Sequence, residues 1–297
     1  MFEKLPNTTN FESQFANKEK FFINGVTVES VDINPENPKT ETPVLIAPGY
    51  GATMDSFKPG MEILVEKNRR VISLNHPRRG GTVPDSLNEE VEKYPREELR
   101  KAQTILGLIE QKNIEKIDVI AHSEGAINVA IAAMLHPEKF RNIVFYAPAG
   151  LIGNDNLFRL IKGAIAGSKR PESISKFPVT EAEKNYLAST ANITSEYQNK
   201  NLVRAVKEVL AISRVQIQEM LKYLREKGVK VVAIAAVDDT LFPMEKMQKD
   251  RNVTTDFVDG FLSVRGGHIQ IQTHPELYMD AAEGMITALE KKEKNTV

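Results

Sequence analysis

Apolar residues along the chain gather in short runs, separated by longer stretches whose apolar positions have helical spacing. The runs lack the polar alternation of a half-exposed strand, which is typical of strands buried on both faces of a parallel sheet. We therefore predict a central, mostly parallel sheet. The runs cover residues 43–49, 70–76, 116–123, 142–149 and 229–237, with weaker ones at 254–258 and 261–264.

Helical patterns lie between these runs, and the clearest covers residues 95–111. Proline opens its first turn and acidic residues follow, as the amino ends of helices prefer. Strands that alternate with helices of this length form an open α/β sheet with helices on both faces and right-handed crossovers. Ahead of the sheet, two alternating runs surround Asn24 and Gly25, which predicts a β-hairpin.

The strand pattern disappears between residues 151 and 228, where four helical patterns follow one another. Active sites of open α/β sheets lie at the carboxyl ends of the strands. An excursion that leaves the sheet at that end should cover the site. We therefore expect a core formed by residues 1–150 and 229–297, with residues 151–228 inserted as a helical cap.

Composition narrows the possible partners and chemistry. The 297 residues include 39 basic and 40 acidic side chains, and no basic cluster with interleaved aromatic residues suggests nucleic acid. Without cysteine, disulfides, thiolate metal sites and cysteine nucleophiles are excluded. No apolar run has the length of a signal peptide or a membrane span, so we expect a cytoplasmic protein without a membrane partner.

One segment combines a strand, a tight turn and a helix around a single serine. The apolar run ends at Ala121, and after His122, Ser123, Glu124 and Gly125 a helical pattern begins at once. Small residues on either side let strand and helix pack closely, and such a strained turn is expected to hold Ser123 in an unusual backbone conformation. The serine then lies beside the first helical N–H groups, where negative charge is favoured.

A serine nucleophile needs a base, and the chain contains five histidines. His268 is the best candidate because it lies in a loop after the last strand-like run, next to Gly266 and Gly267. The other four suit structural roles. They are His76 at a strand end, His122 beside the serine, and His136 and His274 before prolines.

The group that orients the base should be a carboxylate at another strand end. The run at 229–237 is followed by Asp238 and Asp239, and we favour Asp239, although a pair of aspartates can also simply cap a turn. Ser123, Asp239 and His268 would then follow the order nucleophile, acid and base.

Acyl transfer also requires donors for the tetrahedral anion. One should be the N–H of Glu124, and the second should be the N–H of Tyr50 in the glycine-rich loop 47–52. Such a loop could instead hold a phosphate, but neither G-x-G-x-x-G nor a Walker lysine is present.

With these residues placed, the chain from about residue 20 onward resembles the α/β-hydrolase superfamily, specifically its capped esterase, acyltransferase and haloperoxidase-like branch. Five elements carry the resemblance. In chain order they are the oxyanion loop 48–51, the turn 76–82, the elbow 121–125, the acid element 236–243 and the Gly-His pair 267–268. The resemblance implies an α/β-hydrolase fold with an inserted cap, and it supports Asp239 over Asp238.

Three positions depart from the family pattern: Ala121 and Pro48 replace glycine and histidine, and His76 stands where aspartate is usual. Pro48 leaves the Tyr50 amide available. A serine at position 123 argues against the family's aspartate-nucleophile dehalogenases and epoxide hydrolases.

The sequence thus predicts a serine hydrolase that cleaves small or medium carboxylic esters and needs neither a metal nor an organic cofactor. The expected partner is a small-molecule acyl substrate, and no oligomeric state is predicted. Thioester, lactone, C–C or peptide cleavage and acyl transfer on the same triad remain alternatives. So does a ligand receptor without turnover.

Overall fold

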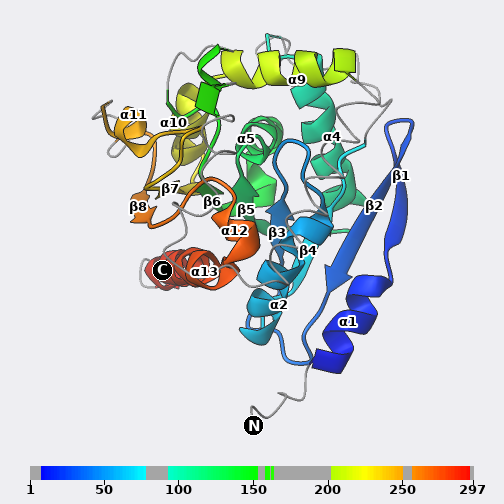
Figure 1. Ribbon diagram of the computed structural model, residues 1–297. Helices are drawn as coiled ribbons and strands as arrows, with labels where there is room; N and C mark the ends of the chain where they lie inside the picture. The colour runs from blue at the N-terminus through cyan, green and yellow to red at the C-terminus, as the bar shows by residue number, and fades with distance from the viewer. Residues whose placement is uncertain are drawn as a thin grey trace.

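The computed structural model describes residues 8–77, 93–152, 158–160, 162–163, 202–249 and 256–294. Within these ranges one sheet has the strand order β1-β2-β4-β3-β5-β6-β7-β8 (Figure 1). Its strands are β1 (Glu19–Ile23), β2 (Val26–Ile33), β3 (Val44–Ala47), β4 (Val71–Leu74), β5 (Ile117–His122), β6 (Phe140–Tyr146), β7 (Lys230–Ala236) and β8 (Gly260–Val264).

The strands from β4 to β8 in this order are parallel, which confirms the predicted mostly parallel sheet. β1 and β2 form the predicted antiparallel hairpin, and β2 attaches it to β4. Asn24 and Gly25 have φ angles of 49° and 82°. Positive φ at both central residues is the conformation that a two-residue hairpin turn requires.

Helices cover both faces of the sheet (Figure 1). On one face lie α1 (Thr8–Ala16), α2 (Lys58–Glu66) and α13 (Pro275–Lys294), and on the other α4 (Arg96–Gln111), α5 (Gly125–Leu135) and α10 (Gln218–Glu226). Further helices are η1 (Met54–Phe57), η2 (Pro137–Lys139), α9 (Leu202–Arg214), α11 (Met244–Lys249) and α12 (Gln270–Thr273), and residues 158–160 and 162–163 are helical too.

Side chains of the central strands alternate between two hydrophobic cores. Val44 and Ile46 of β3 pack in the core under α2 and α13, whereas Leu45 and Ala47 pack in the core under α4 and α5. All four are buried, because a parallel strand between two helical layers has no solvent face. This explains why the sequence shows a continuous apolar run at this strand.

The amino-terminal helix α1 has no counterpart in the sequence prediction. Its apolar residues are few, but Phe11 and Phe15 are buried in the same core as Val31 and Ile33 of β2. Since short helices are stabilised mainly by tertiary packing, the helix forms through these two rings and not through a strong pattern of its own.

The segment expected as a cap is described only in part. Residues 153–157, 161 and 164–201, including the helical pattern predicted at 180–189, lie outside the described residues. α9 lies across the top of the view in Figure 1 and contacts α4. α10 instead packs on α5 and β7 through buried residues such as Leu221 and Leu224. The division into core and cap stays a prediction.

A buried ionic network joins the amino ends of the strands to α13. Arg69, which is fully buried just before β4, donates to Glu283 and Glu290 at 2.8 and 2.7 Å. Arg141 donates to Glu290 and to Asp118 near the start of β5. Burial opposes ionisation of Glu283 and Glu290, but hydrogen bonds and charge from Arg69 outweigh it and lower the pKa of both carboxyls.

Among the described helices, none is both long and apolar enough to cross a membrane. The cellular compartment stays a prediction.

Candidate active site

Ser123 occupies the sharp turn between β5, which ends at His122, and α5, which begins at Gly125. Its φ is 54°, in the left-handed region that residues other than glycine rarely adopt. Hydrogen bonds from the Ser123 N–H to the Tyr146 carbonyl and from the Ala149 N–H to the Ser123 carbonyl, both 3.1 Å, hold this conformation. The strained turn is the one that the sequence predicts.

Close backbone approaches explain two glycines beside the serine. A Cβ on Gly125 would lie 2.6 Å from the carbonyl oxygen of Ala47, so the helix can begin against the end of β3 only without a side chain. A Cβ on Gly49 would lie 2.8 Å from the Cβ of Ser123. The glycine-rich loop therefore lies directly against the serine.

The structure brings Ser123, His268 and Asp239 together from three different loops. The Nε2 atom of His268 lies 2.9 Å from Ser123 Oγ, and its Nδ1 atom lies 2.8 Å from Asp239 Oδ2. Both distances are those of hydrogen bonds. Asp238 lies outside this chain of contacts: its carboxylate is exposed and accepts a 3.3 Å hydrogen bond from the Gly266 N–H.

Asp239 is buried and held as an anion. The backbone N–H groups of Leu241 and Phe242 donate to its Oδ1 at 2.7 and 3.0 Å. Burial would raise the pKa of Asp239, but the charge and hydrogen bond of His268 and these two amides outweigh it, and the pKa lies below its usual value. An ionised Asp239 requires His268 to carry a proton on Nδ1. The lone pair of Nε2 then faces the serine hydroxyl.

The loop that carries the histidine, residues 265–268, is fixed by two tyrosines. The Tyr146 hydroxyl donates to the Gly267 carbonyl at 3.2 Å, and the Tyr278 hydroxyl donates to the carbonyl of the first loop residue at 2.6 Å. Gly266 has a φ of 118°, and a Cβ there would lie 2.2 Å from the Tyr278 hydroxyl. The glycines therefore serve the close backbone approach that the sequence suggested.

His122 touches the site without reaching the serine hydroxyl. Its Nε2 lies 2.9 Å from the carbonyl oxygen of His268, and the two rings are 4.7 Å apart. Burial and the neighbouring His268 lower the pKa of His122 to about 3, so the ring is neutral and donates through Nε2–H. The sequence predicted a structural role for His122, but only its position next to the serine hinted at this contact.

The three other histidines are positioned by other elements of the fold. His136 ends α5, and His274 follows α12. His76 follows β4 and lines a cavity of about 340 Å³ beside the glycine-rich loop. The walls of this cavity come from the hairpin, the loop, the end of β4 and α4. They are Lys20, Thr27, Glu29, Gly49, Gly51, Ala52, Thr53, Asn75, His76, Pro77 and Lys101.

The two predicted anion donors belong to residues next to Ser123: Glu124 follows it in the chain, and Tyr50 follows Gly49, which lies against it. Tyr50 occupies the second position of a turn closed by the Ala52 N–H and the Gly49 carbonyl at 3.1 Å, with Gly51 at a φ of 69°. This is the glycine conformation of a type II turn. At the start of α5, the Glu124 N–H has no acceptor among the described residues.

Metal binding has no evident place in the described part of the chain. No group of three or more histidine, aspartate and glutamate side chains there is arranged to hold an ion.

Solved structures of low sequence identity share this architecture. An enol-lactonase from Burkholderia xenovorans has 14% identity and a TM-score of 0.65, covering 91% of this chain and 100% of its own. A carboxylesterase of the thaumarchaeon Nitrososphaera gargenis has 18% identity and a TM-score of 0.65, covering 93% and 99%. A thermophilic esterase from Thermogutta terrifontis has 16% identity and a TM-score of 0.59, covering 92% and 99%. At these identities the similarity concerns the fold.

The family follows from a match along the sequence itself. The sequence model of the alpha/beta hydrolase fold matches residues 42–275, a range that includes the serine elbow, the acid and the histidine. This range covers most of the chain. The protein therefore belongs to the α/β-hydrolase fold family.

Proposed function

We propose that this protein is a serine hydrolase that cleaves small or medium carboxylic esters through an acyl-enzyme intermediate. The observation that carries the proposal is the continuous chain of hydrogen bonds from Asp239 through His268 to Ser123. A serine hydroxyl alone is a weak nucleophile at neutral pH, and an adjacent oriented base is what activates it. The ester and lactone hydrolases with similar folds support the same class of reaction.

In the first half of the reaction, Ser123 Oγ attacks the ester carbonyl while its proton moves to His268 Nε2. Asp239 keeps the imidazole in the reactive tautomer and stabilises the imidazolium that forms. The N–H groups of Tyr50 and Glu124 donate to the carbonyl oxygen as it becomes an anion. The tetrahedral intermediate then collapses, the C–O bond to the alcohol breaks, and His268 returns the proton to the departing alkoxide.

In the second half, water replaces the alcohol. His268 Nε2 accepts a proton from water as the water oxygen attacks the acyl carbon of the Ser123 ester. Collapse of the second tetrahedral intermediate breaks the bond to Ser123 Oγ, which recovers its proton from His268 and releases the carboxylic acid. Loss of one anion donor in such a site costs about 3–4 kcal/mol of transition-state stabilisation.

The insertion between β6 and β7, residues 151–228, would cover the site as a cap and shape the acyl pocket. Its described helix α9 is connected to α4 by the contact between Lys101 and Glu208. α10 would belong to the helical layer of the core instead, because its apolar side is buried against the sheet. Substrate preference would then depend on the part of the insertion that precedes α10.

The proposal is tested with p-nitrophenyl acetate and butyrate as substrates. Ser123→Ala should abolish turnover and labelling by a fluorophosphonate, because both need the serine oxygen. Ser13→Ala, which changes an exposed serine on α1, is the matched control and should retain wild-type rates. Undiminished hydrolysis by Ser123→Ala would refute the proposal.

A substrate panel separates the remaining reactions on the same triad. Linear esters, a lactone, a thioester and a peptide should be compared by kcat/KM under identical conditions. We expect the highest kcat/KM for the linear esters. Labelling by the fluorophosphonate with a single burst of product and no steady-state turnover on any substrate would indicate a ligand receptor.

A further inference from the structure

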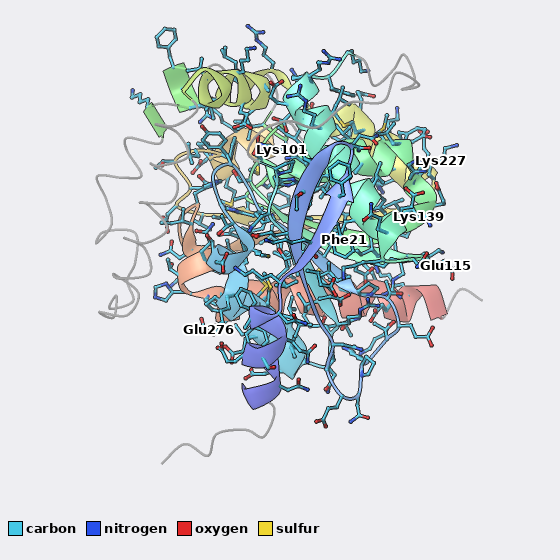
Figure 2. The ribbon with its side chains drawn as sticks, turned by 90° about the vertical axis from the view of Figure 1, so that its right-hand side faces the viewer. Phe21, Lys101, Glu115, Lys139, Lys227 and Glu276 are labelled. Atoms are coloured by element: carbon cyan, nitrogen blue, oxygen red, sulfur yellow. The ribbon has the colours of Figure 1, made fainter. Side chains whose placement is uncertain are left out.

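Four ionisable side chains are buried together behind the serine turn. Glu98 and Lys101 come from α4, Glu124 directly follows Ser123, and Glu208 comes from α9. Their exposed fractions are 0%, 4%, 1% and 0% in this order. Figure 2 labels Lys101, the one cation among the four, in the interior of the molecule below α9.

Lys101 is bound tightly to Glu124. Its Nζ donates to Glu124 Oε1 at 2.6 Å and lies 3.4 Å from an oxygen of Glu208. Burial opposes the charge of Lys101, but the surrounding negative charge, that of Glu124 foremost, outweighs burial and raises the pKa of Lys101. The ammonium group therefore keeps its charge in the interior.

Glu98 is the neutral member of the cluster. Neither of its oxygens receives a hydrogen bond from a described donor, as expected of a carboxyl that carries the proton itself. Burial, together with the negative charge of Glu124, raises the pKa of Glu98 well above its usual value. Glu124 is the neighbour that interacts with this carboxyl, so a proton on Glu98 would be shared with the Glu124 carboxylate.

Burial of such a cluster is unfavourable for folding stability if its role is only structural. Burying charged groups costs several kcal/mol per ion, and well-packed apolar residues often serve stability equally well. This cluster lies where the proposed chemistry needs precise geometry, because the Glu124 N–H is one proposed anion donor. Lys101 also lines the cavity beside Gly49 and Gly51, which flank the second donor.

We propose that Lys101 and Glu98 are positioning residues that hold the Glu124 side chain and so direct the Glu124 N–H toward the developing oxyanion. The inference rests on the proposed ester hydrolysis. A fixed side chain on Glu124 restricts rotation of the peptide before it, and donors held in advance act without reorganisation during the reaction. A neutral Glu98 also adds no further negative charge near the developing oxyanion.

The test measures kcat and KM on p-nitrophenyl butyrate and the inhibition constant of a phenylboronic acid. A boronic acid adds to the serine oxygen as a tetrahedral anion, so its affinity reports on the oxyanion donors. Lys101→Met should lower kcat about tenfold and weaken the boronic acid by a similar factor, with KM within about twofold. This is less than the 10²- to 10³-fold loss typical when a donor is removed.

Conservative variants separate positioning from bulk packing. Lys101→Arg should recover most of the rate because it keeps a cation beside Glu124. Glu98→Leu should lower kcat, whereas Glu98→Gln should recover most of it because an amide N–H can replace the carboxyl proton. Failure of both conservative variants to recover the rate would overturn the proposal.

Two further variants keep the test independent of folding. Lys101→Met with Glu124→Leu replaces the ion pair by apolar side chains, which restores packing. This double variant should fold, yet its kcat and boronic acid affinity should stay reduced. Lys112→Met is the control. Lys112 directly follows α4 and is paired with acidic residues, and its side chain alone is 6% exposed, as is the side chain of Lys101. This variant should leave kcat unchanged.

Outcomes for this inference and for the proposed function differ. Wild-type kcat and boronic acid affinity in the folded double variant, with Ser123→Ala inactive, would overturn only the positioning role. Hydrolysis that survives Ser123→Ala would overturn the proposed function itself.

Discussion

The rings of His122 and His268 lie 4.7 Å apart, and the Nε2–H of His122 donates to the backbone carbonyl of His268 at 2.9 Å. The residue before Ser123 thus holds the loop that carries His268. Phe57 and Tyr146 pack against the other sides of the His122 ring, so the ring has little freedom to move.

His122→Phe should keep the ring packing but lose the donated hydrogen bond. The part-buried His268 carbonyl would lose this partner, which costs at most about 1–3 kcal/mol of folding stability. A less firmly held base should also lower kcat, by about tenfold if roughly 1.4 kcal/mol of transition-state stabilisation is lost. Urea unfolding and ester kinetics measure both effects. His136→Phe, at an exposed position after α5, is the matched control and should change neither quantity.

The same residue should make stability depend on pH. His122 has a pKa of about 3 in the folded protein and an ordinary value of 6.5, so only the unfolded chain binds a proton between these values. The contribution of neutral, buried His122 to the free energy of unfolding is therefore complete above pH 6.5. It is lost as pH falls toward 3, by up to about 1.4 kcal/mol per pH unit. His122→Phe should show a shallower decline of unfolding free energy over this window than the wild type. An identical decline in both proteins would contradict the assignment.

Asp239→Asn should leave the fold intact and reduce kcat by about 10³- to 10⁴-fold, since the amide no longer fixes the His268 tautomer. The matched variant Asp238→Asn changes an exposed neighbour outside the hydrogen-bonded chain and should retain activity within about threefold. Steady-state kinetics on one ester decide between them. Equal losses in the two variants would mean that the orienting acid has been wrongly chosen.

Gly49→Ala should damage catalysis more than stability. The added Cβ would lie 2.8 Å from the Ser123 Cβ and 2.9 Å from the His122 carbonyl, so the loop that carries Tyr50 must move away from the serine. We expect a loss of at least tenfold in kcat. Gly284→Ala, at an exposed position of α13 where an added Cβ would meet no atom within 4 Å beyond its own helix backbone, should instead add about 0.5–1 kcal/mol of stability at unchanged activity. Wild-type kcat in Gly49→Ala would argue against this loop as an anion donor.

Arg69→Met should destabilise the protein by about 3–5 kcal/mol, because it leaves the carboxylates of Glu283 and Glu290 without their buried partner. Lys67→Met breaks only the exposed pair with Asp280 and should cost at most about 1 kcal/mol. Urea unfolding at neutral pH provides both values. The ester hydrolysis rate of folded Arg69→Met should be unchanged, as the network lies far along the strands from Ser123.

The sequence was informative wherever backbone geometry and residue type coincide. The apolar runs predicted the parallel strands, except that the described residues 256–258 of the weaker run at 254–258 are not in a strand. Asn24 and Gly25 predicted the hairpin turn, and strand ends placed Ser123, Asp239 and His268 at one edge. These features depend on neighbours along the chain or on general rules of sheet topology. They can be recognised without knowledge of distant contacts.

Other features depend on packing between distant segments. Glu98 and Lys101 are spaced like exposed charges on a helix, and only the approach of α5 and α9 buries them. α1 forms because Phe11 and Phe15 find a core built mostly from later residues. The contact between His122 and the His268 carbonyl joins residues 146 positions apart, and no local pattern announces it.

Asp118 lies near the amino end of β5, and Ser123 directly follows its carboxyl end. Asp118 belongs to the ionic network around Arg141 and Glu290, whereas Ser123 contacts His268 in the proposed active site. A mutant library confined to the loops around Ser123 would leave that network untouched. Directed evolution of the proposed hydrolase toward new substrates can therefore rely on the stability that this network provides at the amino ends of the strands.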